Sequence, residues 1–302
     1  MTTDSELNKK RLEVKNEINE GINKTPMALP FNITGRFVQK VTGYTKPLPF
    51  MFCVLLLAVI ILLILGLNYL LLFRTAQATT QITPISAAIV VEIMLGIMAA
   101  SHFNIKLVLS SIRDSVVDSI MSSEDLSKLY EWLSLGWSPS TIRRFFFWWI
   151  LFVVGVITLV YVFFSQEGYF SVHLVIPTLL FAFLGGASIY YAALMLLLPA
   201  RLRTYNFKLY ENDPAHSEIV ADISTMLNRF TYGYVFLIVI MQSIFVIGDL
   251  PLIAQIVFGI TSGWVPVIAQ YLVNQSCIRT IISRSKRKTL NRIQAEVKSL
   301  HE

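Results

Sequence analysis

The sequence is poor in charge and in cysteine. Only 15% of its 302 residues are charged, 55% are hydrophobic, and the mean hydropathy is +0.62. An intrinsically disordered chain needs low hydrophobicity and high charge, so that class is excluded. With two cysteines and 14 glycines, a disulfide-rich scaffold and a collagen-like chain are excluded as well. The class that remains is an integral membrane protein.

The usual signatures of catalysis and cofactor binding are also missing. The sequence contains no HExxH, no phosphate-binding GxxxxGK[ST], no GxSxG and no CxxC motif. Its four histidines, His102, His173, His216 and His301, do not pair at one membrane depth, which argues against a haem held by two histidines. We therefore predict no enzymatic activity, no cofactor and no metal.

Six apolar runs are each long enough to cross a bilayer as a helix. At a rise of 1.5 Å per residue, about 20 residues cover the ~30 Å hydrocarbon core. The expected fold is all-α: a polytopic integral membrane protein with six transmembrane helices in three hairpins and short cytoplasmic helices. A re-entrant hairpin is the alternative for the last pair, which only three residues separate. The runs cover residues 50–73, 84–105, 145–165, 173–198, 230–248 and 252–273.

Positive charge is distributed very unevenly among the segments that connect these runs. Of the 25 Lys and Arg residues, 24 fall in the two tails or in every second connection, and Arg74 is the exception. Because positive residues of short loops stay in the cytoplasm, this predicts a multi-pass protein of a plasma or inner membrane with both termini cytoplasmic. Most acidic residues share these segments, so we expect anionic lipid headgroups, and no nucleic acid, as the partner of the basic residues.

The chain is expected to contain three regions with helical segments on the cytoplasmic side. Helix starts are predicted at Ser122-Ser123-Glu124-Asp125, at Ser138-Pro139 and at Asp213-Pro214, the last leading directly into the fifth span. The regions are a cytoplasmic tail at residues 1–48, a six-span domain at 49–276 with helical loops at 106–144 and 199–229, and a basic, amphipathic helical tail at 277–302.

The C-terminal tail carries an apolar seam of two heptads, formed by Leu290, Ile293, Val297 and Leu300. Such a seam either packs on the protein's own cytoplasmic helices or joins copies into a homo-oligomer. For the first alternative, the N-terminal tail offers a partner stripe made of Leu7, Val14, Ile18 and Ile22.

A basic cluster directly precedes this seam, next to the end of the sixth run. It either binds lipid headgroups or serves only to orient the chain in the membrane. Its members are Arg284, Lys286, Arg287 and Lys288.

Glu92 is the one ionisable residue well inside a predicted span, about 12 Å from the start of the second run. Because a buried charge at that depth costs at least ~2.5 kcal/mol, we expect the carboxyl group to be protonated, paired or in contact with water. It is either an ion- or proton-sensing group on a pathway or a neutral hydrogen-bonding group between helices. Candidate partners at similar depth include Thr158, Gln242 and Ser262.

The sixth run carries a stripe of small or polar residues along one face. The stripe is either a closely packed interface or the lining of a hydrated path with a hinge at Pro266. Gly259 and Gly263 form a GxxxG pair, and Gly185-Gly186 in the fourth run suggest a second close contact. The stripe consists of Gln255, Gly259, Ser262, Pro266, Gln270 and Asn274.

Two functions are compatible with these features. The first is a channel or small transporter, expected to assemble from several copies, with the sixth span and Glu92 near the path. The second is a membrane-embedded signalling or scaffold component that binds a soluble cytoplasmic partner through its helices. Six spans with inward termini occur in many unrelated proteins, so the topology alone does not choose between them.

Overall fold

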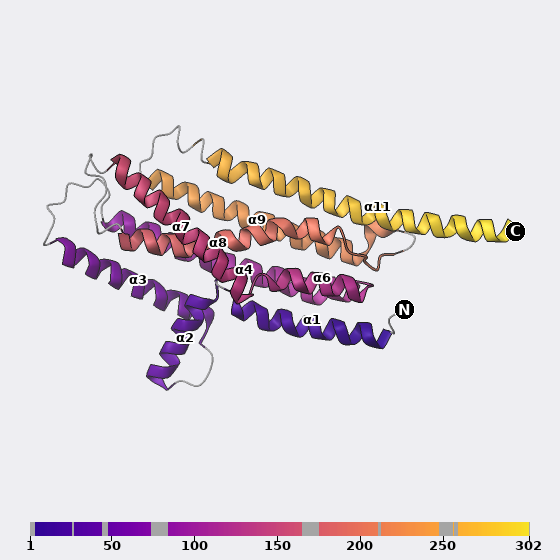
Figure 1. Ribbon diagram of the computed structural model, residues 1–302, viewed down its shortest axis with the longest axis horizontal. Helices are drawn as coiled ribbons and strands as arrows, with labels where there is room; N and C mark the ends of the chain where they lie inside the picture. The colour runs from indigo at the N-terminus through magenta and orange to yellow at the C-terminus, as the bar shows by residue number, and fades with distance from the viewer. Residues whose placement is uncertain are drawn as a thin grey trace.

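A computed structural model describes residues 4–25, 27–43, 48–73, 84–164, 175–210, 213–247, 256 and 259–301. Throughout these ranges the regular backbone is helical, apart from one isolated bridge between Ile120 and Phe207. The elements in chain order (Figure 1) are α1 (Asp4–Lys24), α2 (Leu29–Thr42), α3 (Phe50–Phe73), α4 (Pro84–Ser111), the π-helix η1 (Ile112–Val116), α5 (Val117–Ser119), α6 (Ser123–Ser134), α7 (Pro139–Phe164), α8 (Val175–Leu202), the 3-10 turn η4 (Pro214–His216), α9 (Glu218–Ile247), the π-helix η5 (Gly259–Trp264) and α11 (Val265–His301).

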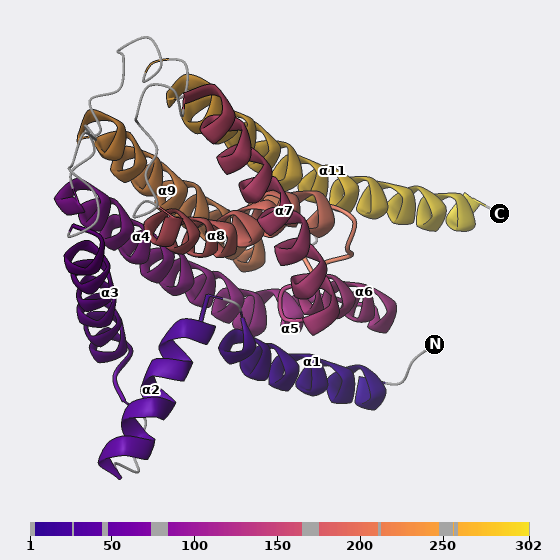
Figure 2. The same ribbon diagram turned by 60° about the vertical axis from the view of Figure 1, so that its left-hand side comes forward.

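The long helices lie side by side in an elongated bundle, with both termini at the same end (Figures 1 and 2). The helix α4 is central, because it contacts α3, α8 and α9. The helix α11 packs on α8 and α9, and its C-terminal part extends past the other helices. The helix α2 departs from this arrangement and crosses the long axis of the bundle beside the start of α3.

Within the described ranges, three helices are long and apolar enough to cross a membrane. These segments are Phe50–Leu67, Val91–Ser119 and Glu218–Ile240. The helices α7, α8 and α11 occupy the other predicted runs, and parts of those runs lie outside the described residues. The junction at residues 249–251, on which the choice between two spans and a re-entrant hairpin depends, lies outside them too.

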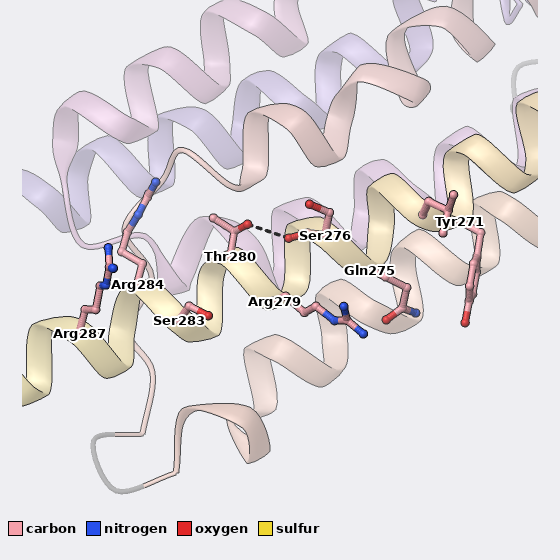
Figure 3. Close-up of a pocket in the computed structure, with 9 residues that line it drawn as sticks. Tyr271, Gln275, Ser276, Arg279, Thr280, Ser283, Arg284 and Arg287 are labelled. Carbon is pink, nitrogen blue, oxygen red and sulfur yellow. Dashed lines mark hydrogen bonds between the residues drawn. The ribbon is translucent and has the colours of Figure 1, made fainter.

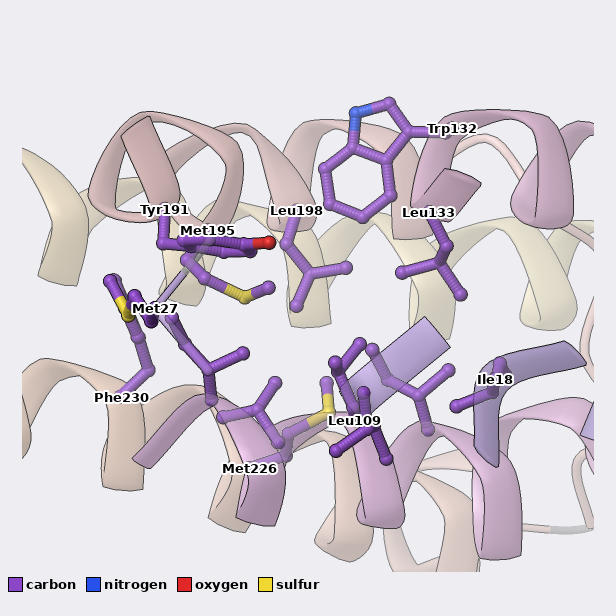
Figure 4. Packing of buried hydrophobic residues seen from close by; sticks show 14 of the residues in the cluster. Ile18, Met27, Leu109, Trp132, Leu133, Tyr191, Met195, Leu198, Met226 and Phe230 are labelled. Atoms are coloured by element: carbon purple, nitrogen blue, oxygen red, sulfur yellow. The ribbon is translucent and has the colours of Figure 1, made fainter. Parts of the chain in front are cut away.

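Among the described residues, a closely packed apolar cluster lies where α1, α6 and the adjoining parts of α4, α8, α9 and α11 meet, and Figure 4 shows part of it. We call this region the base layer. Its largest fully buried side chains include Ile18, Leu126, Leu198 and Ile223, each from a different helix. The base layer consists of α1, residues 105–120, α6, and residues 190–202, 218–231 and 270–285 of α8, α9 and α11.

The N-terminal stripe is buried in the base layer, but its partner differs from the predicted one. Val14, Ile18 and Ile22 are almost fully buried, because α1 packs on α6 and on the end of α4. The N-terminal stripe, which the sequence offered as one possible partner of the C-terminal seam, therefore packs on other helices. Heptad spacing identifies an apolar face, whereas the choice of partner depended on the short α6 helix, which offers its own apolar side to α1.

Two of the three predicted helix starts are confirmed. The Ser122 hydroxyl accepts hydrogen bonds from the backbone N–H groups of Glu124 and Asp125 at 3.2 and 3.5 Å, and α7 begins at Pro139. The third is displaced: Pro214 opens only the 3-10 turn η4. Ser217 then adopts an extended conformation, and α9 begins at Glu218 and continues through the predicted fifth span.

Asp125 links this helix start to the connection between α8 and α9. Its buried carboxylate accepts hydrogen bonds from the backbone N–H of Asn206 at 3.0 Å and from the Asn206 side-chain amide at 3.3 Å. Met121 N–H donates to the Asn206 carbonyl at 3.1 Å. The α8–α9 connection is thus held against α6 by polar groups that water does not reach freely.

Replacing Asp125 with Ala should therefore destabilise the protein by about 2 kcal/mol, because two N–H donors lose a charged acceptor. The measurement is the free energy of unfolding by urea in detergent. Glu124→Ala is the matched control: Glu124 is exposed and pairs only with Lys128, so little change is expected. Equal effects of the two substitutions would contradict this role of Asp125.

Candidate functional site

Glu92 carries a polar atom whose partner is missing from the described residues. It lies in α4 and is partly buried, and its Oε1 is inaccessible to solvent without a hydrogen bond to any described group. Orphaned buried oxygens are rare in native proteins, and each calls for an explanation such as a proton, an ion or water. Glu92 therefore remains a candidate for chemistry inside the bundle.

The polar residues predicted to accompany Glu92 are only partly described. Gln242 lies in α9, half-buried, beside Gly259. Thr158 and Ser262 lie in α7 and η5, and the surroundings of their side chains are outside the described set, as is the whole of Gln255. Among the described residues, no hydrogen bond joins one of these side chains to Glu92.

Two residues of the predicted stripe, Gln270 and Asn274, take part in a buried hydrogen-bond network between α9 and α11. The Gln270 amide donates to Asn274 Oδ1 at 2.9 Å, and the Asn274 amide donates to Thr231 Oγ1 at 3.0 Å. The Thr231 hydroxyl in turn donates to the Leu227 carbonyl at 3.0 Å. All three polar side chains are almost fully buried, so their hydrogen-bonding groups are turned toward protein. Thr231, on the facing helix, does not belong to the stripe and was not predicted.

The glycines of the stripe lie close to side chains of α9. A Cβ atom added to Gly263 would lie 2.8 Å from Ile238 Cγ2, and one added to Gly259 would lie 2.6 Å from Gln242 Nε2. A π-helical segment ends directly before Val265 and Pro266, and widening of a helix next to a proline relieves the clash with the preceding turn. The glycine distances show a close contact between this segment and α9, and the π-helical segment accommodates Pro266 beside it.

The second predicted glycine pair lies in α8. A Cβ on Gly186 would lie 2.5 Å from the indole Nε1 of Trp149 in α7, so only a glycine permits this approach. The surroundings of Gly185 are outside the described set. One turn further along α8, the hydroxyl of Tyr190 donates to the Leu135 carbonyl at 2.5 Å, which fixes the turn between α6 and α7.

The basic cluster is divided between two roles. The Arg284 guanidinium donates to the Thr204 carbonyl at 3.0 Å, and the Lys288 ammonium donates to Asn206 Oδ1 at 2.6 Å. These two side chains therefore fasten α11 to the α8–α9 connection. Lys286 and Arg287 are exposed, and no hydrogen bond from either is given among the described groups.

A hollow of about 680 Å³ runs along α11 beside this cluster (Figure 3). Ser276, Thr280 and Ser283 line it together with Arg279 and Arg287, and its described lining includes no carboxylate. The Thr280 hydroxyl donates to the Ser276 carbonyl at 2.7 Å, whereas guanidinium groups such as those of Arg279 and Arg287 match phosphate oxygens in charge and geometry. Arg279 was not among the predicted headgroup residues, although its spacing of four from Ser283 and eight from Arg287 places it on the same face.

Cys277 adjoins this surface but is directed into the base layer. It is almost fully buried, and burial raises the pKa of its thiol to about 11. A thiol with such a pKa stays protonated at neutral pH and is a poor nucleophile or metal ligand. Cys277 is therefore a packing residue.

The apolar seam of the C-terminal tail is left uncovered by the described residues. Its members lie in the part of α11 that projects past the base layer, and 47% to 84% of each side chain's surface is exposed. The residues are Leu290, Ile293, Val297 and Leu300. Nothing in the described chain packs against them.

Comparison of the chain with protein-family models, with curated proteins and with solved structures found no match. Function is therefore argued from the residues alone.

The contact at Gly263 generates a test of helix packing. Gly263→Ala should reduce the free energy of unfolding by about 1–3 kcal/mol, because the new methyl group overlaps the branched side chain of Ile238. Gly66→Ala in α3 is the matched control. No heavy atom lies within 4 Å of its added Cβ, so a gain of roughly 0.5–1 kcal/mol from helix propensity is expected. Urea unfolding in detergent measures both, and a neutral Gly263→Ala would contradict the close contact.

Proposed function

We propose that the chain is a six-span membrane protein with cytoplasmic termini, which acts as a scaffold for a soluble partner. Three apolar helices, the uneven distribution of Lys and Arg, and the position of both termini at one end of the bundle support this orientation. The base layer is then the cytoplasmic part of the molecule. The docking element is the projecting part of α11.

The observation that carries the proposal is the exposed tail seam, Leu290, Ile293, Val297 and Leu300. Four apolar side chains in a heptad pattern on a free-standing helix are costly in water, and they are typical of a helix that pairs with another. Two heptads are too short to form a stable pair alone. The scaffold contributes by holding this helix already folded, which removes most of the ordering cost of binding.

The attachment of α11 to the base layer makes this presentation rigid. Arg284 and Lys288 bind the α8–α9 connection, and Cys277 and Ile281 are buried in the base layer just before the tail. The docking element therefore starts after Lys288. The tail up to that residue is fixed to the base layer.

The chemistry of the partner follows from the charge around the seam. Four basic residues, Arg284, Lys286, Arg287 and Lys288, directly precede the seam, while the segment after Lys288 balances Arg292 and Lys298 with Glu296 and Glu302. A second copy aligned in parallel would bring the two basic clusters together, whereas an amphipathic helix with an acidic flank would complement the cluster. We propose such an acidic helix as the partner.

Ile293→Glu should abolish capture of the partner by the full-length protein in detergent, because it places a charge in the middle of the seam. Ala295→Glu is the matched control: it adds the same charge on the opposite side of the helix. Partner binding is measured by pull-down with an acidic amphipathic helical peptide and with soluble proteins. Thermal unfolding should be unchanged in both variants, since residues 293 and 295 are exposed.

Three results would contradict the scaffold proposal. In the first, Ile293→Glu and Ala295→Glu bind equally well. In the second, a chain that ends at Lys288 still retains the partner. In the third, Ile293→Glu only converts an oligomer into a monomer, which would identify a second copy as the occupant of the seam.

The unpartnered oxygen of Glu92 supports a second candidate, a channel or small transporter with Glu92 near the path. An ionisable group inside a span is expected to pair or to contact water, and transported ions or protons provide such contacts. The packed stripe of α11 weighs against its use as a path lining, because Gln270 and Asn274 already bond to protein groups.

Glu92→Gln should lower ion flux into proteoliposomes if this second function operates, because the neutral amide neither binds nor releases a proton. Gly96→Ala, one turn along α4 in open space, is the control and should leave flux unchanged. Unchanged flux together with unchanged thermal stability in Glu92→Gln would rule out a pathway role. Absence of flux in the unaltered protein would rule out the transport function itself.

A further inference from the structure

The helix α2 presents an apolar stripe that the described chain leaves uncovered. Ile33, Phe37 and Val41 recur every four residues, and between 58% and 68% of each side chain's surface is exposed. The opposite side of the helix is buried, with Phe31 and Thr34 almost inaccessible. The α2 helix thus packs on the rest of the protein along one side and leaves an apolar side exposed.

The buried side fixes α2 at the beginning of the first span. The rings of Phe31 and Phe50 meet edge-to-face with their centroids 4.8 Å apart, and a Cβ atom on Gly35 would lie 3.4 Å from the sulfur of Cys53. In Figure 1, α2 runs across the long axis of the bundle at the level where α3 begins. If α3 crosses the membrane along that axis, α2 lies in the plane of the membrane surface.

The start of α3 also presents apolar side chains outward. Met51, Phe52 and Leu55 are exposed, as the residues of the α2 stripe are. In a spanning helix, side chains at this depth face lipid. Because α2 packs against this same end of α3, the medium around the start of α3 also reaches the α2 stripe.

The polar side of α2 carries only positive charge. Arg36 and Lys40 lie three positions after Ile33 and Phe37, along one edge of the stripe, and the helix contains no Asp or Glu. Basic residues beside an apolar stripe are the pattern of helices that lie in the headgroup region of an anionic leaflet.

We infer that α2 is an interfacial helix, with Ile33, Phe37 and Val41 in the outer acyl region and Arg36 and Lys40 among anionic phosphate groups. This rests on the proposed membrane orientation. It adds a lipid-binding surface that the spans alone do not require.

The interfacial helix is also joined firmly to the base layer. The Asn32 side-chain amide donates to the Asn23 carbonyl at the end of α1 at 2.8 Å, and Met27 and Ala28, between the two helices, are buried. The depth of α2 in the leaflet therefore sets the height of α1, and with it the height of the base layer above the membrane.

Nitroxide labels on the full-length protein in vesicles test the placement. Phe37→Cys and Arg36→Cys receive the label, while the native Cys53 and Cys277 are buried and stay unlabelled. The vesicles contain phosphatidylcholine with phosphatidylserine. The label at 37 should collide with oxygen and lose collisions with a water-soluble nickel chelate, and the label at 36 should show the reverse.

A label at Leu63, an exposed residue in the middle of α3, separates this inference from the membrane proposal. If the label at 63 is oxygen-accessible and the label at 37 collides with nickel, α2 is not interfacial and the span stands. If both collide with nickel, the membrane orientation fails. Protection of position 37 from both reagents would show that protein covers the stripe, and this would overturn the inference.

The charge on α2 has its own test. With Arg36→Gln and Lys40→Gln combined, the depth of the label at 37 should become the same in vesicles with and without phosphatidylserine. Lys286→Gln with Arg292→Gln removes the same charge from α11. In this control, the label at 37 should still lie at different depths in vesicles with and without phosphatidylserine. If both double variants lose the phosphatidylserine dependence of label depth equally, the overall positive charge of the protein, and not α2, is responsible for the response to anionic lipid.

Discussion

The base layer depends on how the short non-helical connection after α8 finds partners for its backbone. Buried N–H and C=O groups are costly unless they are hydrogen-bonded, and this segment has no helix of its own to supply the bonds. Lys208 N–H donates to the Ser119 carbonyl at 2.8 Å, and Asp125 accepts from Asn206. From the other side, Arg284 of α11 donates to the Thr204 carbonyl. Because its partners come from α5, α6 and α11, this connection orients three helices at once.

Local features of this architecture could be predicted from the sequence, because their causes lie within a few residues. The start of α6 follows from the Ser122 side chain, which accepts hydrogen bonds from the first N–H groups of the helix. The start of α7 follows from Pro139, because proline has no N–H group that needs a partner. The apolar runs predicted helices, since any chain that avoids water there must also bond its own backbone. The small and polar residues of the sixth run were predicted to lie along one face of a helix. That Glu92 lies within a long apolar helix followed from counting residues.

Choice of partner could not be predicted, because it depends on residues far away in the chain. Spacing alone made the N-terminal stripe and the C-terminal seam equally suitable for each other, yet Ile18 packs in the base layer while Ile293 projects into solvent. Thr231 completes the network of Asn274 only through the register of two packed helices. The division of the basic cluster has the same origin: Arg284 and Lys286 look alike in sequence, and only the former lies within reach of Thr204.

The continuity of α11 has a mechanical consequence. Its 37 residues form one uninterrupted helix of about 55 Å, which begins beside the π-helical turn at Gly259–Trp264 and ends beyond the base layer. A stiff rod of that length converts a small rotation at one end into a large displacement at the other: a tilt of about 5° moves the tip by roughly 5 Å, close to one helical turn. A small movement at the Gly259–Trp264 end can therefore be transmitted to the far tip without any local unfolding.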